Sequence, residues 1–175
     1  GTNNGYGHSR GIEFFYRDKK TIKRADYWIS YSFLDTKRLY NNFEKEAMPT
    51  FAANHTGSIV FKYFFPKISL APSLTYGYST GRPYYNPNNP DYLSDRTRDY
   101  HNLSVSFSYL TSIKKSFTVL VFSVNNVPGV KNVFSYNYSS DGSRRQEVGP
   151  TSARFFFIGM FVNIGSQKDD SDKFN

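Results

Sequence analysis

An aromatic run near the end of the sequence, residues 151–165, limits the folds open to this chain. It reads T-S-A-R-F-F-F-I-G-M-F-V-N-I-G and is rich in Phe, Ile and Val. The run is too short for a membrane-spanning helix, whereas about ten residues suffice for a tilted strand to cross a bilayer. At a period of two residues, Phe156, Ile158, Met160 and Val162 share one apolar face. We therefore predict a β-strand, and the hypothesis to test is that it closes a transmembrane barrel.

The same one-sided alternation recurs upstream, most clearly in residues 25–35 and 100–110. In each segment apolar side chains occupy every second position and mostly polar ones lie between them, which is typical of strands with one apolar face. We predict strands at 11–18, 25–35, 55–65, 68–79, 100–110, 117–124, 132–139 and in the final run. The side chains predicted to face lipid are Tyr27, Ile29, Tyr31, Phe33, Leu103, Val105, Phe107, Ile158, Met160 and Val162.

Composition favours a membrane barrel over a soluble sheet protein. Aromatic residues make up 19% of the chain, with 15 Tyr and 17 Phe, yet the mean hydropathy is −0.58. Outer-membrane barrels use such residues as girdles at both membrane interfaces. The net charge is +8, but the basic clusters lie between the predicted strands, so we interpret them as solvated turns and expect no nucleic-acid partner. A barrel rim that meets anionic lipid headgroups would use the same charges.

The connections between the predicted strands alternate in length. Short turns alternate with long polar segments at 36–54, 80–99 and 140–150, as in bacterial barrels with short turns at one end and long loops at the other. Residues 117–139 allow two interpretations: one long strand with a bulge at 125–131, or a hairpin turn at 127–130. The first gives about seven strands and a piece of a larger barrel, and the second about eight and possible closure of a small one.

A proline inside a predicted strand and a charged segment at the end of the sequence lead to two further predictions. Pro72 lies inside the predicted strand 68–79, and because proline removes a ladder hydrogen bond we expect a bulge there. We assign residues 1–165 to the barrel segment and expect residues 166–175 to be a charged, disordered tail.

The sequence does not indicate an enzyme. His8, His55 and His101 are isolated from carboxylates and from one another, cysteine is absent, and no serine lies in a nucleophile motif. We therefore predict no catalytic residue, metal site or cofactor. For a small external ligand, the candidate contacts lie in the long segment 80–99, and they are Arg82, Tyr84, Tyr85, Arg96 and Arg98.

Several motifs, taken in order, resemble the C-terminal part of TonB-dependent outer-membrane receptors of the Bacteroidetes type. They are G-Y-G-H-S-R-G-I-E-F-F-Y-R-D, D-Y-W-I-S-Y-S-F-L-D-T, S-T-G-R-P-Y, V-N-N-V-P-G-V-K-N-V-F and R-F-F-F-I-G-M-F-V-N-I-G, and they cover essentially the whole chain. The resemblance implies an all-β fold of antiparallel transmembrane strands in the outer membrane, in contact with its lipid. It also implies import of a scarce nutrient such as an iron chelate, cobalamin or a glycan.

The family's plug domain and TonB-contacting box have no counterpart in the sequence, so TonB and the plug would act through a part of the protein upstream of it. A terminal aromatic residue, common in the family, is replaced by Phe174-Asn175 after a charged tail.

Two other functions remain open from the residues. A soluble β-barrel that binds a small apolar ligand would show the same alternation with its aromatic face inside. A non-catalytic surface or adhesion module would use the long loops as contact surfaces.

Overall fold

The computed structural model describes residues 5–163, which form a single antiparallel sheet and one small separate hairpin. The strands of the sheet are β1 (Gly7–Asp18), β2 (Ala25–Leu39), β3 (Glu46–Ala47), β4 (His55–Tyr63), β5 (Leu70–Ser79), β6 (Tyr100–Ile113), β7 (Ser116–Asn125) and β10 (Phe155–Val162). The hairpin consists of β8 (Ser135–Tyr138) and β9 (Arg145–Val148), and a short 3-10 helix, η1 (Pro66–Ile68), precedes β5. The all-β, antiparallel prediction is therefore confirmed.

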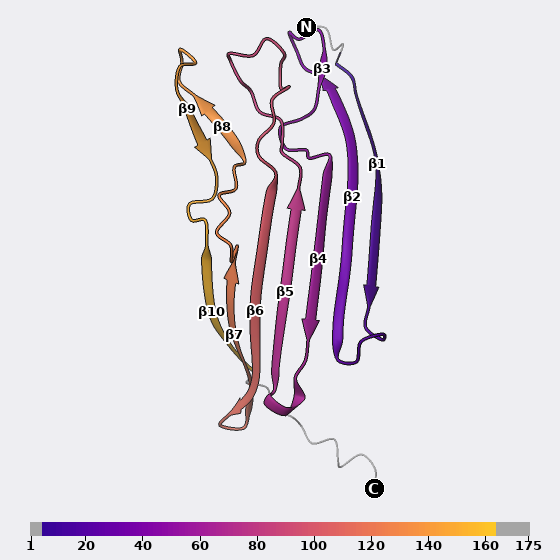
Figure 1. The fold of residues 1–175 in the computed structure, drawn as a ribbon, viewed down its shortest axis with the longest axis vertical. Helices are drawn as coiled ribbons and strands as arrows, with labels where there is room; N and C mark the ends of the chain where they lie inside the picture. Colours follow the sequence, from indigo (N-terminus) through magenta and orange to yellow (C-terminus); the bar gives the residue numbers. More distant parts are fainter. Residues whose placement is uncertain (1–4, 164–175) are drawn as a thin grey trace.

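Long strands that are neighbours in sequence are also neighbours in space. The order is β1-β2-β4-β5-β6-β7-β10, with the two-residue β3 paired to one end of β2 (Figure 1). β1 and β10 are the two edges, so residues 5–163 form an open sheet and not a closed barrel. The tail predicted at 166–175 lies outside the described residues.

The register places all ten predicted lipid-facing side chains on one face of the sheet. Residues directly opposite each other in an antiparallel pair point to the same side. One continuous row across the strands runs Phe14, Tyr31, Gly57, Tyr78 and His101, and another reaches Ile158 through Phe107 and Phe122. We call this the aromatic face; it carries Ile12, Phe14, Tyr16, Tyr27, Ile29, Tyr31, Phe33, Ile59, Phe61, Leu74, Tyr76, Tyr78, Leu103, Val105, Phe107, Tyr109, Leu120, Phe122, Val124, Phe156, Ile158, Met160 and Val162.

The opposite face is polar over the middle of the sheet. There the register brings together rows of small hydroxyl side chains, with Ser73, Ser106 and Ser123 side by side on three adjacent strands. Toward the β10 edge this face becomes apolar as well, because Val121 and Phe157 lie on it. Large apolar side chains on the aromatic face are exposed within the described chain, Ile158 at 82% and Phe107 at 39%.

All three short turns lie at one end of the sheet and all three long connections at the other, as the alternating lengths predicted (Figure 1). Residues 19–24, 64–69 and 114–115 form the short turns. The last is a two-residue hairpin in which Lys114 and Lys115 have φ values of 50° and 68°, the pattern of a type I′ turn that follows the twist of the strands.

The prediction of a bulge at Pro72 was wrong. β5 pairs with β6 residue for residue from Leu70 to Ser79, so there is no bulge at Pro72. The β4–β5 pairing ends at Ser73, and the N–H that proline lacks therefore falls just beyond that ladder.

Residues 117–139 form neither one long strand nor a hairpin turning at 127–130. β7 ends at Asn125, and β8 pairs with β9, which lies in a segment that was expected to be a loop. The sheet of the described residues contains seven long strands and the two-residue β3.

The closest packing in the described chain lies among the long connections and not in the sheet. We call residues 40–54, 80–99 and 126–154 the loop head. Seven of the nine buried hydrophobic residues belong to it: Ala47, Met48, Ala52, Ala53, Tyr84, Leu93 and Val133. Asn88 Nδ2 donates to the Gly142 carbonyl at 2.9 Å, and Lys45 approaches Asp91 to 3.2 Å, so the three connections form one body over the sheet end.

Candidate functional site

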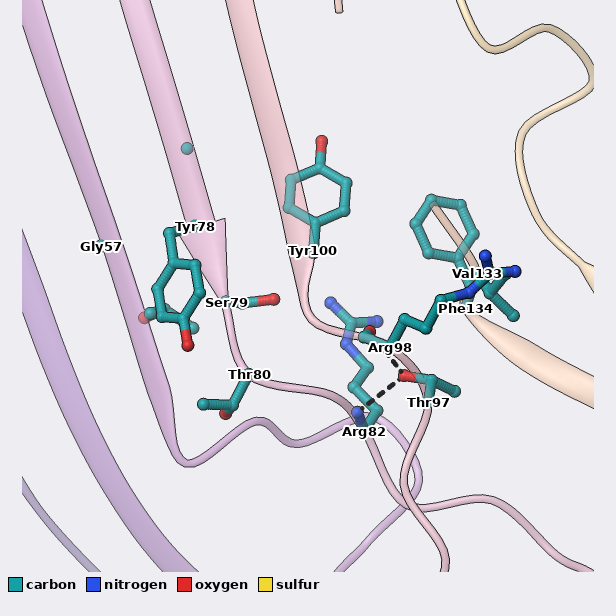
Figure 2. A pocket seen from close by; sticks show the side chains of 12 residues that line it. Gly57, Tyr78, Ser79, Thr80, Arg82, Thr97, Arg98, Tyr100, Val133 and Phe134 are labelled. Atoms are coloured by element: carbon teal, nitrogen blue, oxygen red, sulfur yellow. Dashed lines mark hydrogen bonds between the residues drawn. The ribbon is translucent and has the colours of Figure 1, made fainter. Parts of the chain in front are cut away.

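A cavity of about 570 Å³ lies where the sheet meets the loop head. Its wall comes from the loop ends of β4, β5 and β6 and from the segment after β7 (Figure 2). Two of the five predicted ligand residues, Arg82 and Arg98, line this cavity. The others that it uses are Thr56, Gly57, Gly77, Tyr78, Ser79, Thr80, Thr97, Tyr100, Val133 and Phe134.

The S-T-G-R-P-Y motif holds Arg82 in position. At Gly81 a Cβ would collide with the Thr97 carbonyl, so the two arms of the loop approach as closely as they do only because the residue is glycine. The Gly81 N–H donates to Asp99 Oδ1 at 2.9 Å, and the Arg82 N–H donates to Thr97 Oγ1 at 3.0 Å. Pro83 is fully buried and pairs with Arg96 across the loop. The backbone of Arg82 is therefore fixed while its side chain projects into the cavity (Figure 2).

The two arginines of the cavity differ in their charge balance. Arg98 forms an ion pair with Glu147 of β9, and Lys131 binds the same carboxylate at 2.8 Å. Lys131, together with Arg98, lowers the pKa of the Glu147 carboxyl below its usual range, which keeps that carboxyl ionised. The Arg82 guanidinium, by contrast, has no ion pair or hydrogen bond with any residue of the described range 5–163. The cavity thus holds one compensated and one uncompensated cation.

Aromatic rings form part of the wall next to these charges. The Tyr100 and Phe134 rings lie 6.3 Å apart with 29° between their planes, and the Tyr78 hydroxyl donates to Asp99 Oδ2 at 2.8 Å. A guanidinium beside aromatic surface is suited to a planar or partly apolar anion, because it offers bidentate donors for the charge and ring faces for the body.

The remaining predicted ligand residues lie elsewhere. Tyr84 is buried against Tyr136, with ring centroids 4.6 Å apart, so it supports the loop head. Tyr85 is 55% exposed and faces Tyr92. Arg96 donates from Nη1 to the Met48 sulfur at 2.9 Å, lines a second cavity of about 590 Å³, and has its pKa lowered by desolvation.

Sequence reasoning did not identify the wall residues Tyr78, Tyr100 and Phe134. Tyr78 and Tyr100 come from the strand ends that flank the segment 80–99, and their place next to the predicted ligand segment could have identified them. Phe134 comes from a different connection, about fifty residues from Arg82, and no local pattern links the two.

In residues 5–163 no helix is long and apolar enough to span a membrane, and no group of three or more His, Cys, Asp or Glu side chains is placed to hold a metal ion. The chain matches no protein-family model, no curated protein and no solved structure.

Proposed function

We propose that this chain is part of the wall of an outer-membrane β-barrel receptor of the TonB-dependent type, which binds a small external nutrient for import. The observation that carries the proposal is the single-layered sheet with one continuous aromatic face and no second layer of described residues over it. In water such a surface far exceeds the apolar patch that a monomeric protein tolerates. In a bilayer it would face lipid and the opposite face would line the lumen.

The distribution of residue types on the aromatic face supports a bilayer environment. Tyrosine and histidine gather toward its loop end, where the Tyr31 hydroxyl lies 2.8 Å from His55 Nδ1 and Tyr76 lies equally close to His101. Tyr16 and Tyr27 lie toward the short-turn end, and the side chains between the two ends are mostly Ile, Leu, Val, Met and Phe. Amphipathic rings at both interfaces with an aliphatic band between them are typical of membrane barrels.

Strand length and connection length agree with the same assignment. β4 has nine residues and β5 and β7 have ten each, close to the roughly 9–11 residues of a tilted membrane-crossing strand. β1, β2 and β6 are longer, with 12, 15 and 14 residues, and are long enough to cross. The long connections gather at one end, which in bacterial barrels is the external end. In this assignment TonB and the plug domain lie outside the described residues. The loop head is the surface that contacts the ligand.

Refolding of the purified 175-residue chain tests the membrane part of the proposal. We expect a heat-dependent gel shift and a cooperative unfolding transition in detergent micelles, and aggregation or disorder in plain buffer, because the aromatic face needs an apolar solvent. A cooperative monomer in plain buffer would contradict the proposal and would favour a soluble barrel with its aromatic face inside.

Replacement of Arg82 tests the ligand part. We expect Arg82→Gln to weaken binding of citrate, used as a probe anion, by about tenfold or more, since a charge-assisted hydrogen bond contributes about 1.5–3 kcal/mol. Isothermal titration of the refolded chain would measure the change. The matched control is Arg144→Gln, which removes an exposed arginine of the loop head away from the cavity. Equal effects of the two variants would show that citrate binding depends only on the net charge of the chain and not on Arg82.

A further inference from the structure

The three short turns together form a strongly basic end of the sheet. They contain seven lysine or arginine residues and no aspartate or glutamate, although each turn comes from a different part of the chain. We call these residues the basic rim: Lys19, Lys20, Lys23, Arg24, Lys67, Lys114 and Lys115. The loop head at the other end carries both signs and binds them to each other, as in the Lys45–Asp91 and Lys131–Glu147 pairs.

The basic side chains of the rim are exposed and mostly unpaired within residues 5–163, so they can bind an external anion. All seven residues are exposed. The nearest acidic residue, Asp18, uses its carboxylate on the turn itself, where it accepts from the N–H groups of Lys20 at 2.7 Å and Thr21 at 2.9 Å. Asp26 is bound by both Nε and Nη2 of Arg17, and Lys19 reaches it only at 3.9 Å. Within residues 5–163 the other six basic side chains of the rim have no ion pair.

An apolar groove adjoins this rim on the aromatic face. Its volume is about 490 Å³, and it is lined by Phe61, Tyr63, Phe65, Pro72, Ser73, Leu74, Val105 and Phe107. Phe65 lies in the same short turn as Lys67, so the groove begins next to the rim. Pro72 and Phe107 are direct partners across β5 and β6, which places the groove over the paired strands.

We infer that the rim and groove together bind an anionic phospholipid, with its phosphate at the basic turns and an acyl chain in the groove. The inference rests on the proposed function, because it requires the aromatic face to lie in a bilayer. Charge complementarity selects the ligand class. A rim of seven basic residues, of which only Lys19 forms an ion pair within residues 5–163, attracts anionic headgroups. The attraction per basic residue near a membrane surface is enough to change binding about fivefold. Zwitterionic phospholipids would fill the groove but gain little at the rim.

Binding of two lipids to the refolded 175-residue chain in zwitterionic detergent micelles tests the inference. Native mass spectrometry over a titration would give dissociation constants for dioleoylphosphatidylglycerol and dioleoylphosphatidylcholine. We expect wild-type protein to prefer phosphatidylglycerol, and Lys67→Gln with Lys114→Gln to weaken that lipid by about 25-fold while phosphatidylcholine binding stays the same. The control double variant, Lys37→Gln with Arg144→Gln, removes the same charge outside the rim and should leave both constants unchanged.

A second measurement needs no substitution. Raising NaCl from about 0.1 M to 1 M shortens the Debye length from about 10 Å to 3 Å and should abolish the preference of the wild-type chain for phosphatidylglycerol. Equal affinity for the two lipids, or equal losses in the rim and control variants, would overturn the inference and leave the membrane proposal intact. A chain that folds as a monomer in plain buffer would overturn both.

Discussion

Phe107→Lys is expected to destabilise the membrane-inserted chain by about 2–4 kcal/mol, the cost of a basic side chain on the lipid face near the bilayer midplane. Phe107 lies in the middle of β6 on the aromatic face, between Pro72 of β5 and Phe122 of β7. In the proposed orientation a lysine there would direct its ammonium group into the hydrocarbon layer. The measurement is the free energy of unfolding from a urea titration of the chain in phosphatidylcholine vesicles, followed by the heat-dependent gel shift.

The matched control for this variant is the preceding residue. Ser106 lies at the same depth of β6 but on the opposite face, between Ser73 and Ser123. Ser106→Lys would place its ammonium group in the proposed lumen, where water solvates it, and we expect a change of less than about 1 kcal/mol. If Ser106→Lys proved the more damaging of the two, the serine face would be the one in lipid and the assigned orientation would be wrong.

The strands were predictable because their period is short and repeated. In residues 25–35 the period of two places Tyr27, Ile29, Tyr31 and Phe33 on one face of the strand, and a slip of its pairing by one residue would turn that face to the other side of the sheet. The sequence of each strand therefore shows which of its side chains share a face. The short turns add the pairing of neighbours, since a two-residue connection such as 114–115 permits only an antiparallel hairpin.

The predictions failed where structure depends on contacts between connections. β8 lies within the strand predicted at 132–139, but its partner β9 is a four-residue strand in a segment expected to be a loop, and their pairing outside the sheet was not predicted. In the candidate site Arg82 and Phe134 come from separate connections, so their meeting depends on how the loop head packs. The effect of Pro72 was predicted wrongly because it depends on where the β4–β5 ladder ends. The sequence pattern of a single strand does not show where its pairing with a neighbour ends.

The second large effect is expected at Asn126, which organises the turn after β7. Its side chain is 5% exposed, donates from Nδ2 to the carbonyls of Val130 and Ala153, and accepts from the Val130 N–H at 3.1 Å. Its φ of 53° is also unfavourable for alanine. Asn126→Ala therefore removes the partners of the Val130 N–H and the Ala153 carbonyl, whereas the Val130 carbonyl keeps its hydrogen bond from the Asn132 N–H. Together with the unfavourable φ, we expect this loss to destabilise the segment 126–154 by about 3 kcal/mol.

Hydrogen exchange of the Val130 amide in the refolded chain would measure this effect, since exchange reports local opening even where the sheet stays intact. A loss of about 3 kcal/mol corresponds to roughly a hundredfold faster exchange in Asn126→Ala. Asn137→Ala is the control, because Asn137 is an exposed residue of β8 in the same connection. Citrate binding at Arg82 should weaken with the first variant alone, since Val133 and Phe134 of the cavity wall follow directly from the turn that Asn126 holds. Unchanged exchange at Val130 would mean that packing of the loop head, and not the asparagine hydrogen bonds, fixes that turn.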